Sequence, residues 1–156
     1  MTQRVDLATV MDRLAIDELI TGYAVAVDDA DWGAYRRLFT EDGRADYRSA
    51  GGIAGPAADV ADWLAATVSR FPVRQHLIVN RRVRIEDLGG YPGDNADVLA
   101  DYLNPMHPEP GDSELDDFVS GGRYSFALRR TEDGWRLRSL VVHEKWRRTL
   151  GTLSAE

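Results

Sequence analysis

The sequence predicts an α+β fold in which helices cover one face of a curved antiparallel sheet. Apolar residues recur at intervals of three and four through much of the first half, which is typical of amphipathic helices. The second half consists of long runs rich in β-branched and aromatic residues, separated by turn sequences. No repeat, linker or change of composition divides the 156 residues, so we expect one domain spanning residues 1–156, with its core at about residues 5–148.

Three helices are expected in the first half of the chain. The first spans Asp6 to Asp28, and the second spans Trp32 to Phe39 with Asp31 as its N-terminal cap. The third spans roughly Ala57 to Arg70, with Pro56 in its first turn. The apolar spacing of the first helix predicts a buried stripe made of Leu7, Val10, Leu14, Ile16, Ile20, Tyr23 and Val27.

The strands follow mainly after Pro72. A turn at residues 40–43 precedes one short strand, and Glu132-Asp133-Gly134 is a strong signal for the turn of a closing hairpin. The expected strands are residues 44–48, 73–88, 96–104, 118–131 and 135–146. Strict alternation along residues 73–88 places Leu77, Val79, Val83 and Ile85 on one face.

Composition excludes several classes of function. The chain carries 19 Lys and Arg against 26 Asp and Glu, a net charge of -7, which disfavours nonspecific binding to nucleic acids and anionic membranes. There is no cysteine, which removes disulfides, thiolate nucleophiles and cysteine-based metal sites. No apolar run is long enough to span a bilayer, and the N-terminus lacks a signal-peptide pattern, so we expect a soluble, cytoplasmic protein.

Asp28 is the first candidate for chemistry. A carboxylate in the last turn of a helix faces the negative end of the helix dipole, so this position is favourable only with solvation or a cationic partner. Asp29 and Asp31 flank it, and a solvated acid in a polar turn explains the residue equally well.

His76 is the second candidate, because histidine is the side chain best suited to proton transfer near neutral pH. Strand alternation places it with Ile78 and Asn80, opposite Leu77 and Val79. A row that mixes Ile with His and Asn is typical of a pocket wall, although a surface or satisfied core histidine remains the alternative.

Asp101, Tyr23 and Tyr47 are weaker candidates. Asp101 shares a strand face with Leu99 and Leu103, which indicates either a sheet edge or a cavity with a partner. The two tyrosines are either core aromatics or phenols that bind or protonate a substrate oxygen. The histidines show no metal-ligand spacing, and the sequence contains neither a nucleophile elbow nor a phosphate-binding loop.

Taken together, these segments resemble a known family. The order and spacing of the following motifs are similar to those of SnoaL-like proteins, in the nuclear transport factor 2-like superfamily: Ala15 to Ile20, Tyr23-Ala24, Asp28 to Trp32, Leu38 to Gly43, Asp46-Tyr47, Gln75-His76 and Asp133-Gly134-Trp135. The resemblance implies a cone formed by one curved sheet wrapped around three helices that encloses a deep pocket. It is strongest to the dehydratase and lyase branch, which includes scytalone dehydratase, bile-acid 7α-dehydratase and hexachlorocyclohexane dehydrochlorinase.

The resemblance also implies roles for individual residues. Asp28 and His76 match an Asp–His dyad that acts as the base in an elimination, and Tyr23 and Tyr47 match tyrosines of the pocket. A further polar pocket residue falls on Asp101 or, with a different gap, on His107. Asn80, His107 and Trp63 are expected to contact substrate.

The implied function is a dehydratase or isomerase without metal or cofactor, acting on a small, apolar, oxygenated cyclic compound of polyketide, steroid or terpenoid type. The implied partner is a second or third copy of the chain, bound through the outer face of the sheet. A ligand-binding or assembly module without chemistry, such as a protein similar to the small subunit of ring-hydroxylating dioxygenases, is the alternative, and an epoxide hydrolase is the third choice. The lysine of the dehydrochlorinase is absent at Tyr23, and Ser125-Phe126-Ala127 does not reproduce the polar residues in the last hairpin of scytalone dehydratase, so no individual substrate is implied.

Overall fold

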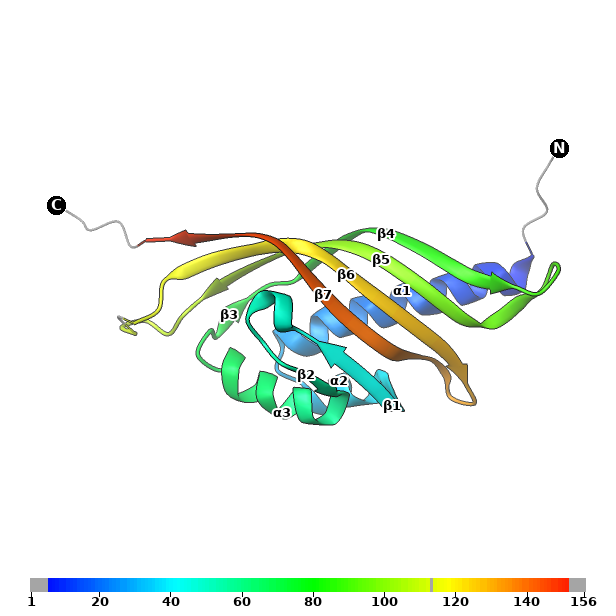
Figure 1. The fold of residues 1–156 in the computed structure, drawn as a ribbon, viewed down its shortest axis with the longest axis horizontal. Coiled ribbons are helices and arrows are strands. Elements are labelled where there is room, and N and C mark those ends of the chain that lie inside the picture. Colours follow the sequence, from blue (N-terminus) through cyan, green and yellow to red (C-terminus); the bar gives the residue numbers. More distant parts are fainter. Residues whose placement is uncertain (1–5, 113, 152–156) are drawn as a thin grey trace.

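The computed structural model describes residues 6–112 and 114–151, which form three helices and a strongly curled sheet. In Figure 1 the sheet arches over α1, while α2 and α3 lie below the arch beside β1 and β2. The described elements are α1 (Leu7–Asp28), α2 (Trp32–Arg37), β1 (Phe39–Asp46), η1 (Arg48–Ala50), β2 (Ala54–Pro56), α3 (Ala57–Val68), β3 (Val73–Arg74), β4 (Leu77–Asp87), β5 (Pro92–His107), β6 (Asp117–Thr131) and β7 (Gly134–Leu150). The predicted α+β class and cone-shaped sheet are confirmed.

The helices begin and end where polar side chains and backbone geometry stop them. Asp6 caps α1 by accepting from the Ala8 amide, and Asp31 caps α2 by accepting from the Ala34 amide at 2.9 Å. Between α1 and α2, Ala30 adopts a left-handed conformation (φ 55°), which turns the chain after α1. Helix α3 ends at Val68, two residues before the predicted end, and Pro56 stands at its N-cap position.

The sheet runs in the order β2-β1-β7-β6-β5-β3, and β4 also pairs with β5. The prediction of a purely antiparallel sheet is wrong in one place, because β1 pairs parallel with β7. The chain does fold back at residues 40–43, as predicted, since a Cβ on Gly43 would come within 2.8 Å of the Phe39 Cβ and 2.9 Å of the Thr40 carbonyl oxygen. Those residues lie within β1, where the register against β7 shifts between Phe39 and Arg44, so the turn-forming sequence is accommodated as a bulge.

Because β4 contains a bulge, the predicted assignment of its side chains to one face is wrong. The register against β5 shifts by one residue between Val79 and Arg82, and Asn80 takes a left-handed conformation (φ 52°). Because side chains alternate with a period of two, one extra residue exchanges the faces. Leu77 and Val79 are therefore exposed on the outside, whereas Val83 and Ile85 pack against the core.

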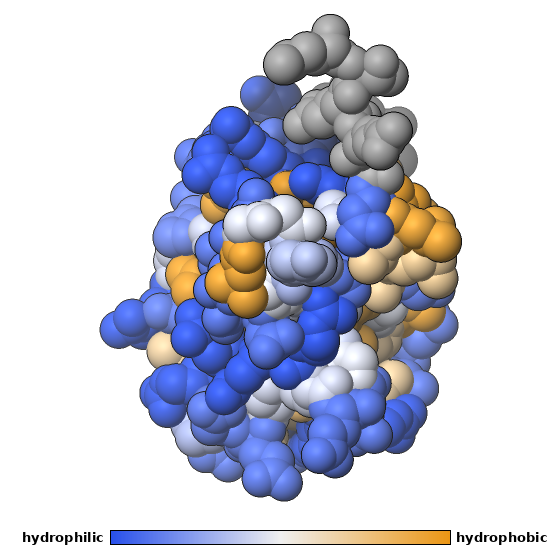
Figure 2. All heavy atoms as spheres, turned by 90° about the vertical axis from the view of Figure 1, so that its right-hand side faces the viewer, coloured by the Kyte–Doolittle hydropathy of each residue, from blue (hydrophilic) through white to orange (hydrophobic). Residues whose placement is uncertain are grey.

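The apolar residues in the first two turns of α1 are exposed. Ile16, Ile20 and Tyr23 are fully buried, as predicted, but Leu7 and Leu14 are 72% and 61% exposed. Figure 2 views this end of the molecule, where apolar surface occurs in separate patches among hydrophilic side chains. The buried apolar stripe is thus shorter than the sequence periodicity suggests, because in the second turn Asp12 faces the hairpin between β6 and β7, whereas Leu14 is on the exposed side.

A charged cluster ties the second turn of α1 to the hairpin between β6 and β7. Arg130 donates two hydrogen bonds to Asp12, at 2.8 and 2.7 Å, and the Trp135 indole donates a third at 3.1 Å. The Arg130 guanidinium also stacks over the Trp135 ring, and its hydrogen bonds hold the pKa of Asp12 below its usual value. Since Asp12 is only 13% exposed, this cluster fixes the direction in which α1 crosses the sheet.

Asp12→Ala should lower the free energy of unfolding by about 1–3 kcal/mol, because Arg130 and the Trp135 N–H lose a shared, largely buried acceptor. Urea unfolding followed by circular dichroism measures this. The matched control is Asp42→Asn, which breaks an exposed pair with Arg129 and should leave the unfolding midpoint nearly unchanged. Equal effects of the two substitutions would contradict the assigned role of the Asp12 cluster.

Candidate active site

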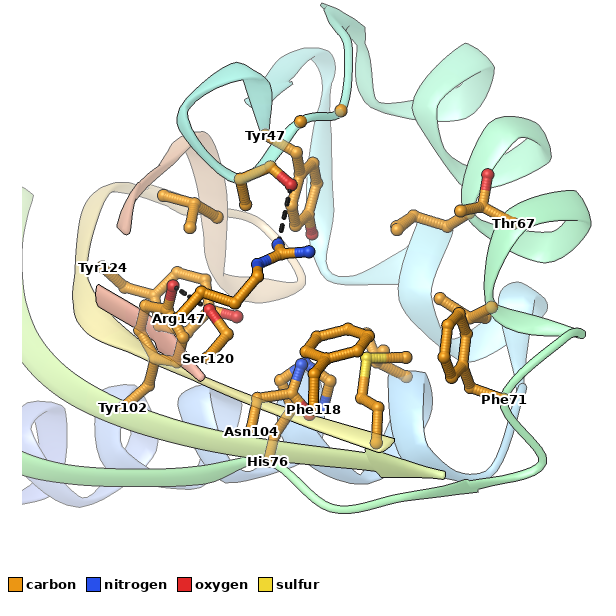
Figure 3. A pocket seen from close by; sticks show the side chains of 18 of the residues that line it. Tyr47, Thr67, Phe71, His76, Tyr102, Asn104, Phe118, Ser120, Tyr124 and Arg147 are labelled. Carbon is orange, nitrogen blue, oxygen red and sulfur yellow. Dashed lines mark hydrogen bonds between the residues drawn. The ribbon is translucent and has the colours of Figure 1, made fainter. Parts of the chain in front are cut away.

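A cavity of about 330 Å³ opens between the inner face of the sheet and the helices. Figure 3 shows aromatic and apolar side chains on most of its wall, with polar groups gathered along one side. Its lining comes from all parts of the chain: Tyr23, Val27, Tyr47, Ala50, Gly51, Gly52, Trp63, Leu64, Thr67, Val68, Phe71, His76, Tyr102, Asn104, Met106, Phe118, Ser120, Tyr124, Val142 and Arg147.

Asp28 and His76 form a closely bonded pair on this wall. The His76 Nδ1 lies 2.6 Å from one carboxylate oxygen of Asp28, and the His76 backbone N–H donates to the other oxygen at 2.8 Å. The His76 side chain is 7% exposed and the Asp28 side chain is 19% exposed. Since the carboxylate accepts at Nδ1, that nitrogen carries the proton and the neutral ring presents Nε2 as its basic atom. The sequence-based expectation that Asp28 needs a partner is met by His76.

Arg74 holds the segment that carries His76, a role that the sequence did not indicate. Its guanidinium donates to the carbonyl oxygens of Val27, at 2.9 Å, and Phe71, at 2.8 Å, with a longer bond to Val68. These carbonyls lie at the C-terminal ends of α1 and α3 or just beyond, where backbone acceptors lack helical partners and a cation is favourable. Arg74 thereby fixes the chain two residues before His76.

Four tyrosine hydroxyls meet beside the pair. Tyr23 donates to Tyr124 at 3.4 Å, and its oxygen lies 2.8 Å from that of Tyr47, which in turn lies 3.2 Å from that of Tyr35. Burial raises the pKa of Tyr23 and of Tyr47 well above 10, raises the pKa of Tyr124, and raises that of Tyr35 to about 12. All four phenols therefore remain neutral hydrogen-bond donors at physiological pH.

The directions of these bonds follow from counting protons. Each hydroxyl has one proton, so if Tyr23 donates to Tyr124, then Tyr47 donates to Tyr23 and Tyr35 donates to Tyr47. Tyr124 then retains its own proton, for which the described residues supply no acceptor. Because Tyr124 lines the cavity, it is the hydroxyl of this cluster best placed to donate to a ligand.

Three of the predicted site residues lie elsewhere. Asp101 is on the outer face of the sheet, where it accepts from Arg123 at 2.8 Å and from Asn80 at 3.1 Å. Asn80 reaches that face because the bulge in β4 exchanges inside and outside. His107 is half exposed and pairs with Asp117. The expectation that these side chains line the pocket is therefore corrected. Asp101 is not at a sheet edge either, because β5 pairs with β6 on one side and with β3 and β4 on the other.

Trp63 does line the cavity, as expected, and its ring lies 6.5 Å from that of Tyr47. The close approach of Gly52 makes this packing possible, since a Cβ there would come within 2.7 Å of the Trp63 ring and 2.8 Å of the Tyr47 Cβ. The sequence around Gly52 does not indicate this contact, because packing against a distant tryptophan leaves no local pattern.

Asn104, Tyr102, Ser120 and Tyr124 are pocket residues that the sequence analysis did not identify. Alternation along β5 would have placed Tyr102 and Asn104 on one face, opposite Asp101, once that face was known to be the inner one. Across residues 6–112 and 114–151, no three His, Asp or Glu side chains cluster in a way that could hold a metal ion. Within the same residues no helix is long and apolar enough to cross a membrane.

Residues 8–141 match the model of the SnoaL-like domain. The chain belongs to the SnoaL-like family. It is 35% identical over 131 residues to the uncharacterized protein Rv2910c of Mycobacterium tuberculosis (strain ATCC 25618 / H37Rv), which covers 84% of each chain. The predicted family is thereby confirmed, and the pocket of this SnoaL-like protein is its candidate active site.

Solved structures similar to this SnoaL-like protein include one described as a candidate aromatic ring hydroxylase from Novosphingobium aromaticivorans. It has a TM-score of 0.76 and 28% identity, covering 90% of this chain and 94% of the other. A hexachlorocyclohexane dehydrochlorinase from Novosphingobium barchaimii shares the fold, with a TM-score of 0.76 at 18% identity over 97% and 99% of the chains. A candidate scytalone dehydratase from N. aromaticivorans does so as well, with a TM-score of 0.74 at 17% identity over 94% and 93%.

The tyrosine cluster predicts a loss of stability in alkali. Unfolding returns each phenol to its ordinary pKa near 10, so the unfolded chain loses protons that the folded chain keeps. The contribution of these protonated phenols to the free energy of unfolding is fully present below pH 10. It falls by about 1.4 kcal/mol per pH unit for each such tyrosine as the pH rises towards the folded-state pKa, which is about 12 for Tyr35.

Urea unfolding at pH 8, 10 and 11 measures this decline, and Tyr35→Phe should reduce its slope. The same free energy of unfolding at pH 8 and pH 11 would contradict the protonation state assigned to the cluster.

Proposed function

We propose that this SnoaL-like protein is a dehydratase or isomerase that uses His76, oriented by Asp28, as a general base. The observation that carries the proposal is the 2.6 Å contact between the His76 Nδ1 and Asp28, made on the wall of a largely apolar cavity. A carboxylate that accepts at Nδ1 fixes the tautomer and stabilises the imidazolium that forms when Nε2 takes a proton.

The proposed reaction begins with removal of a proton from a carbon next to a carbonyl group. His76 Nε2 takes the proton, and the electrons of the C–H bond form a carbon–carbon double bond as the carbonyl oxygen gains negative charge. In a dehydration, the enolate then expels a β-hydroxyl group, which leaves as water with the proton returned from the imidazolium. In an isomerisation, the same proton returns to a different carbon.

The tyrosine cluster supplies the second requirement, stabilisation of the developing oxyanion. A hydroxyl that keeps its proton and faces the cavity, as the Tyr124 hydroxyl does, can donate to the substrate carbonyl oxygen. General-base catalysis typically contributes about 10²–10⁴-fold and one oxyanion donor about 10²–10³-fold.

The lining supports a substrate that is mostly apolar and cyclic. Phe71, Met106 and Phe118, together with Trp63, offer flat or adaptable apolar surface, while polar groups are confined to the dyad, the tyrosines and one side of the sheet. Oxygenated ring compounds of polyketide, steroid or terpenoid type fit this division.

A ligand-binding or assembly module without chemistry is the second candidate. It is favoured by the 28% identity to a structure described as an aromatic ring hydroxylase, because the small subunit of ring-hydroxylating dioxygenases is an assembly module of this fold. An epoxide hydrolase is the third candidate, and it would require several polar groups around one water molecule rather than a single base.

His76→Ala and Asp28→Asn should each lower kcat/KM by at least about 10²-fold for a cyclic β-hydroxy ketone that the wild-type protein converts to an enone. The absorbance of the enone measures turnover, and far-ultraviolet circular dichroism tests whether each variant is folded. Asp101→Asn is the matched control, because this acid lies on the outer face and should leave kcat/KM unchanged. Activity like that of the wild type in the His76 variant would exclude the mechanism.

We also propose that the outer face of the sheet joins two or three copies of the chain. Leu77, Val79, Leu99 and Leu103 are each 42% to 45% exposed there, on the adjacent strands β4 and β5. Leu99→Asp combined with Leu103→Asp should convert the oligomer into a monomer in light-scattering measurements. A wild-type protein that is already monomeric would contradict this proposal.

A further inference from the structure

Tyr35 joins the tyrosine cluster from outside the cavity. It lies in α2, its side chain is fully buried (0% exposed), and it is not part of the cavity lining. Its ring packs against those of Trp32, Phe39 and Tyr23, with ring centroids 5.9, 5.1 and 6.0 Å away. This packing holds the ring so that its hydroxyl oxygen lies 3.2 Å from that of Tyr47.

The Tyr35 hydroxyl has one hydrogen-bond partner. Within residues 6–112 and 114–151, only Tyr47 bonds to it. If Tyr47 donated to Tyr35, the proton of Tyr35 would be buried without an acceptor, which is costly. If Tyr35 donates, only lone pairs stay unpaired, and an oxygen with two lone pairs tolerates this more readily. Burial therefore makes Tyr35 the donor.

This donation gives the chain of hydroxyls one direction. Tyr47 accepts from Tyr35, so its single proton is available for the 2.8 Å contact with Tyr23. The other end requires the same order, because Tyr23 is the donor in its 3.4 Å contact with Tyr124 and cannot also donate to Tyr47. Figure 3 shows Tyr47 and Tyr124 among the side chains of the cavity wall, where this chain ends.

A hydroxyl that accepts a hydrogen bond becomes a stronger donor, by about 10–30% for each bond in such a chain. Tyr124 stands at the end of three successive donations, and its own proton has no acceptor among the described residues. The buried hydroxyl of Tyr35 thus affects the donor strength of a group that it does not touch.

We propose that Tyr35 is a positioning residue, which directs the protons of Tyr47 and Tyr23 towards Tyr124 and so strengthens Tyr124 as a donor to the carbonyl oxygen of the substrate. The order of the hydroxyls is a property of the protein alone. Its effect on a substrate rests on the proposed function, and the two are tested separately.

Neutron diffraction from crystals of the deuterated protein locates the hydroxyl deuterons directly. In the wild-type protein the deuteron of Tyr35 should point to Tyr47, and that of Tyr47 should point to Tyr23. In Tyr35→Phe, Tyr47 no longer accepts from a third hydroxyl, so the deuteron of the Tyr47–Tyr23 contact should divide between the two oxygens. Tyr91→Phe is the matched control, because Tyr91 is 72% exposed and should leave the order unchanged.

The effect on a ligand is measured with 2,2-dimethyl-1-indanone labelled with carbon-13 at its carbonyl group. This ketone has no α-proton, so it reports hydrogen bonding without proton transfer. The bound carbonyl resonance should lie furthest downfield in the wild-type protein, less far in Tyr35→Phe and least far in Tyr124→Phe. The dissociation constant of Tyr35→Phe should stay within about twofold of the wild-type value, because only the polarisation of one donor changes.

Two results would overturn the assigned direction. They are a Tyr47 deuteron that points to Tyr35 in the wild-type protein, and an undivided wild-type order in Tyr35→Phe. The first needs no variant, so it decides the question even if Tyr35→Phe fails to fold, which circular dichroism would reveal.

The effect on substrate would be overturned by no detectable binding of the labelled ketone, or by the same bound resonance in the wild-type protein and folded Tyr35→Phe. Failure of the proposed elimination would appear separately, as no acceleration of α-proton exchange in an enolisable ketone by the wild-type protein, or as full activity of His76→Ala.

Discussion

The site depends on one constraint, a buried carboxylate at the C-terminal end of α1. Asp28 is the last residue of α1, where the helix dipole disfavours negative charge, and its side chain is mostly buried. The ring and the backbone N–H of His76 offset this cost by donating to both carboxylate oxygens. Arg74 places its own charge on the carbonyls nearby and holds the chain in position. The end of one helix thus determines where the proposed base stands.

The cavity around this pair divides into an apolar part and two polar parts. Burial keeps the tyrosine cluster protonated, so its hydroxyls remain donors. On another side of the cavity, the Glu144 carboxylate accepts hydrogen bonds from Ser120 and Arg147, so the contact between Ser120 and Tyr102 is donated by Tyr102. Of the acidic residues, Asp28 and Glu144 accept hydrogen bonds from residues that line the cavity.

The elements that could be predicted are those with regular local patterns. The helix periodicity predicted α1 to α3 within a few residues, and the Glu132-Asp133-Gly134 turn predicted the last hairpin. Asp28 and His76 were identified because a helix-terminal acid and a histidine in a mixed row are locally unusual, and because both match family positions. Their 2.6 Å contact spans 48 residues of sequence, and periodicity alone could not have placed them together.

The other features of the site depend on a bulge and on strand register, which hydrophobic periodicity does not predict. One left-handed residue, Asn80, exchanges the faces of β4 and moves its own side chain to the outside. Asp101 was predicted as a possible pocket residue because alternation separates the two faces of β5 but does not indicate which of them is the inner face. Asn104 and Ser120 could be identified as pocket residues only from the strand register, which places them opposite each other on β5 and β6. Neither side chain carries a charge that would mark it in the sequence.

Deuterium exchange into a ketone tests most directly whether His76 removes a proton within this pocket. With 1-indanone in deuterium oxide, the wild-type protein should accelerate loss of the α-proton signal in the nuclear magnetic resonance spectrum well above the buffer rate. His76→Ala should return that rate to the buffer value, because no other group is assigned as the base. Exchange at the buffer rate with the wild-type protein, or accelerated exchange with His76→Ala, would contradict the role assigned to the Asp28–His76 pair.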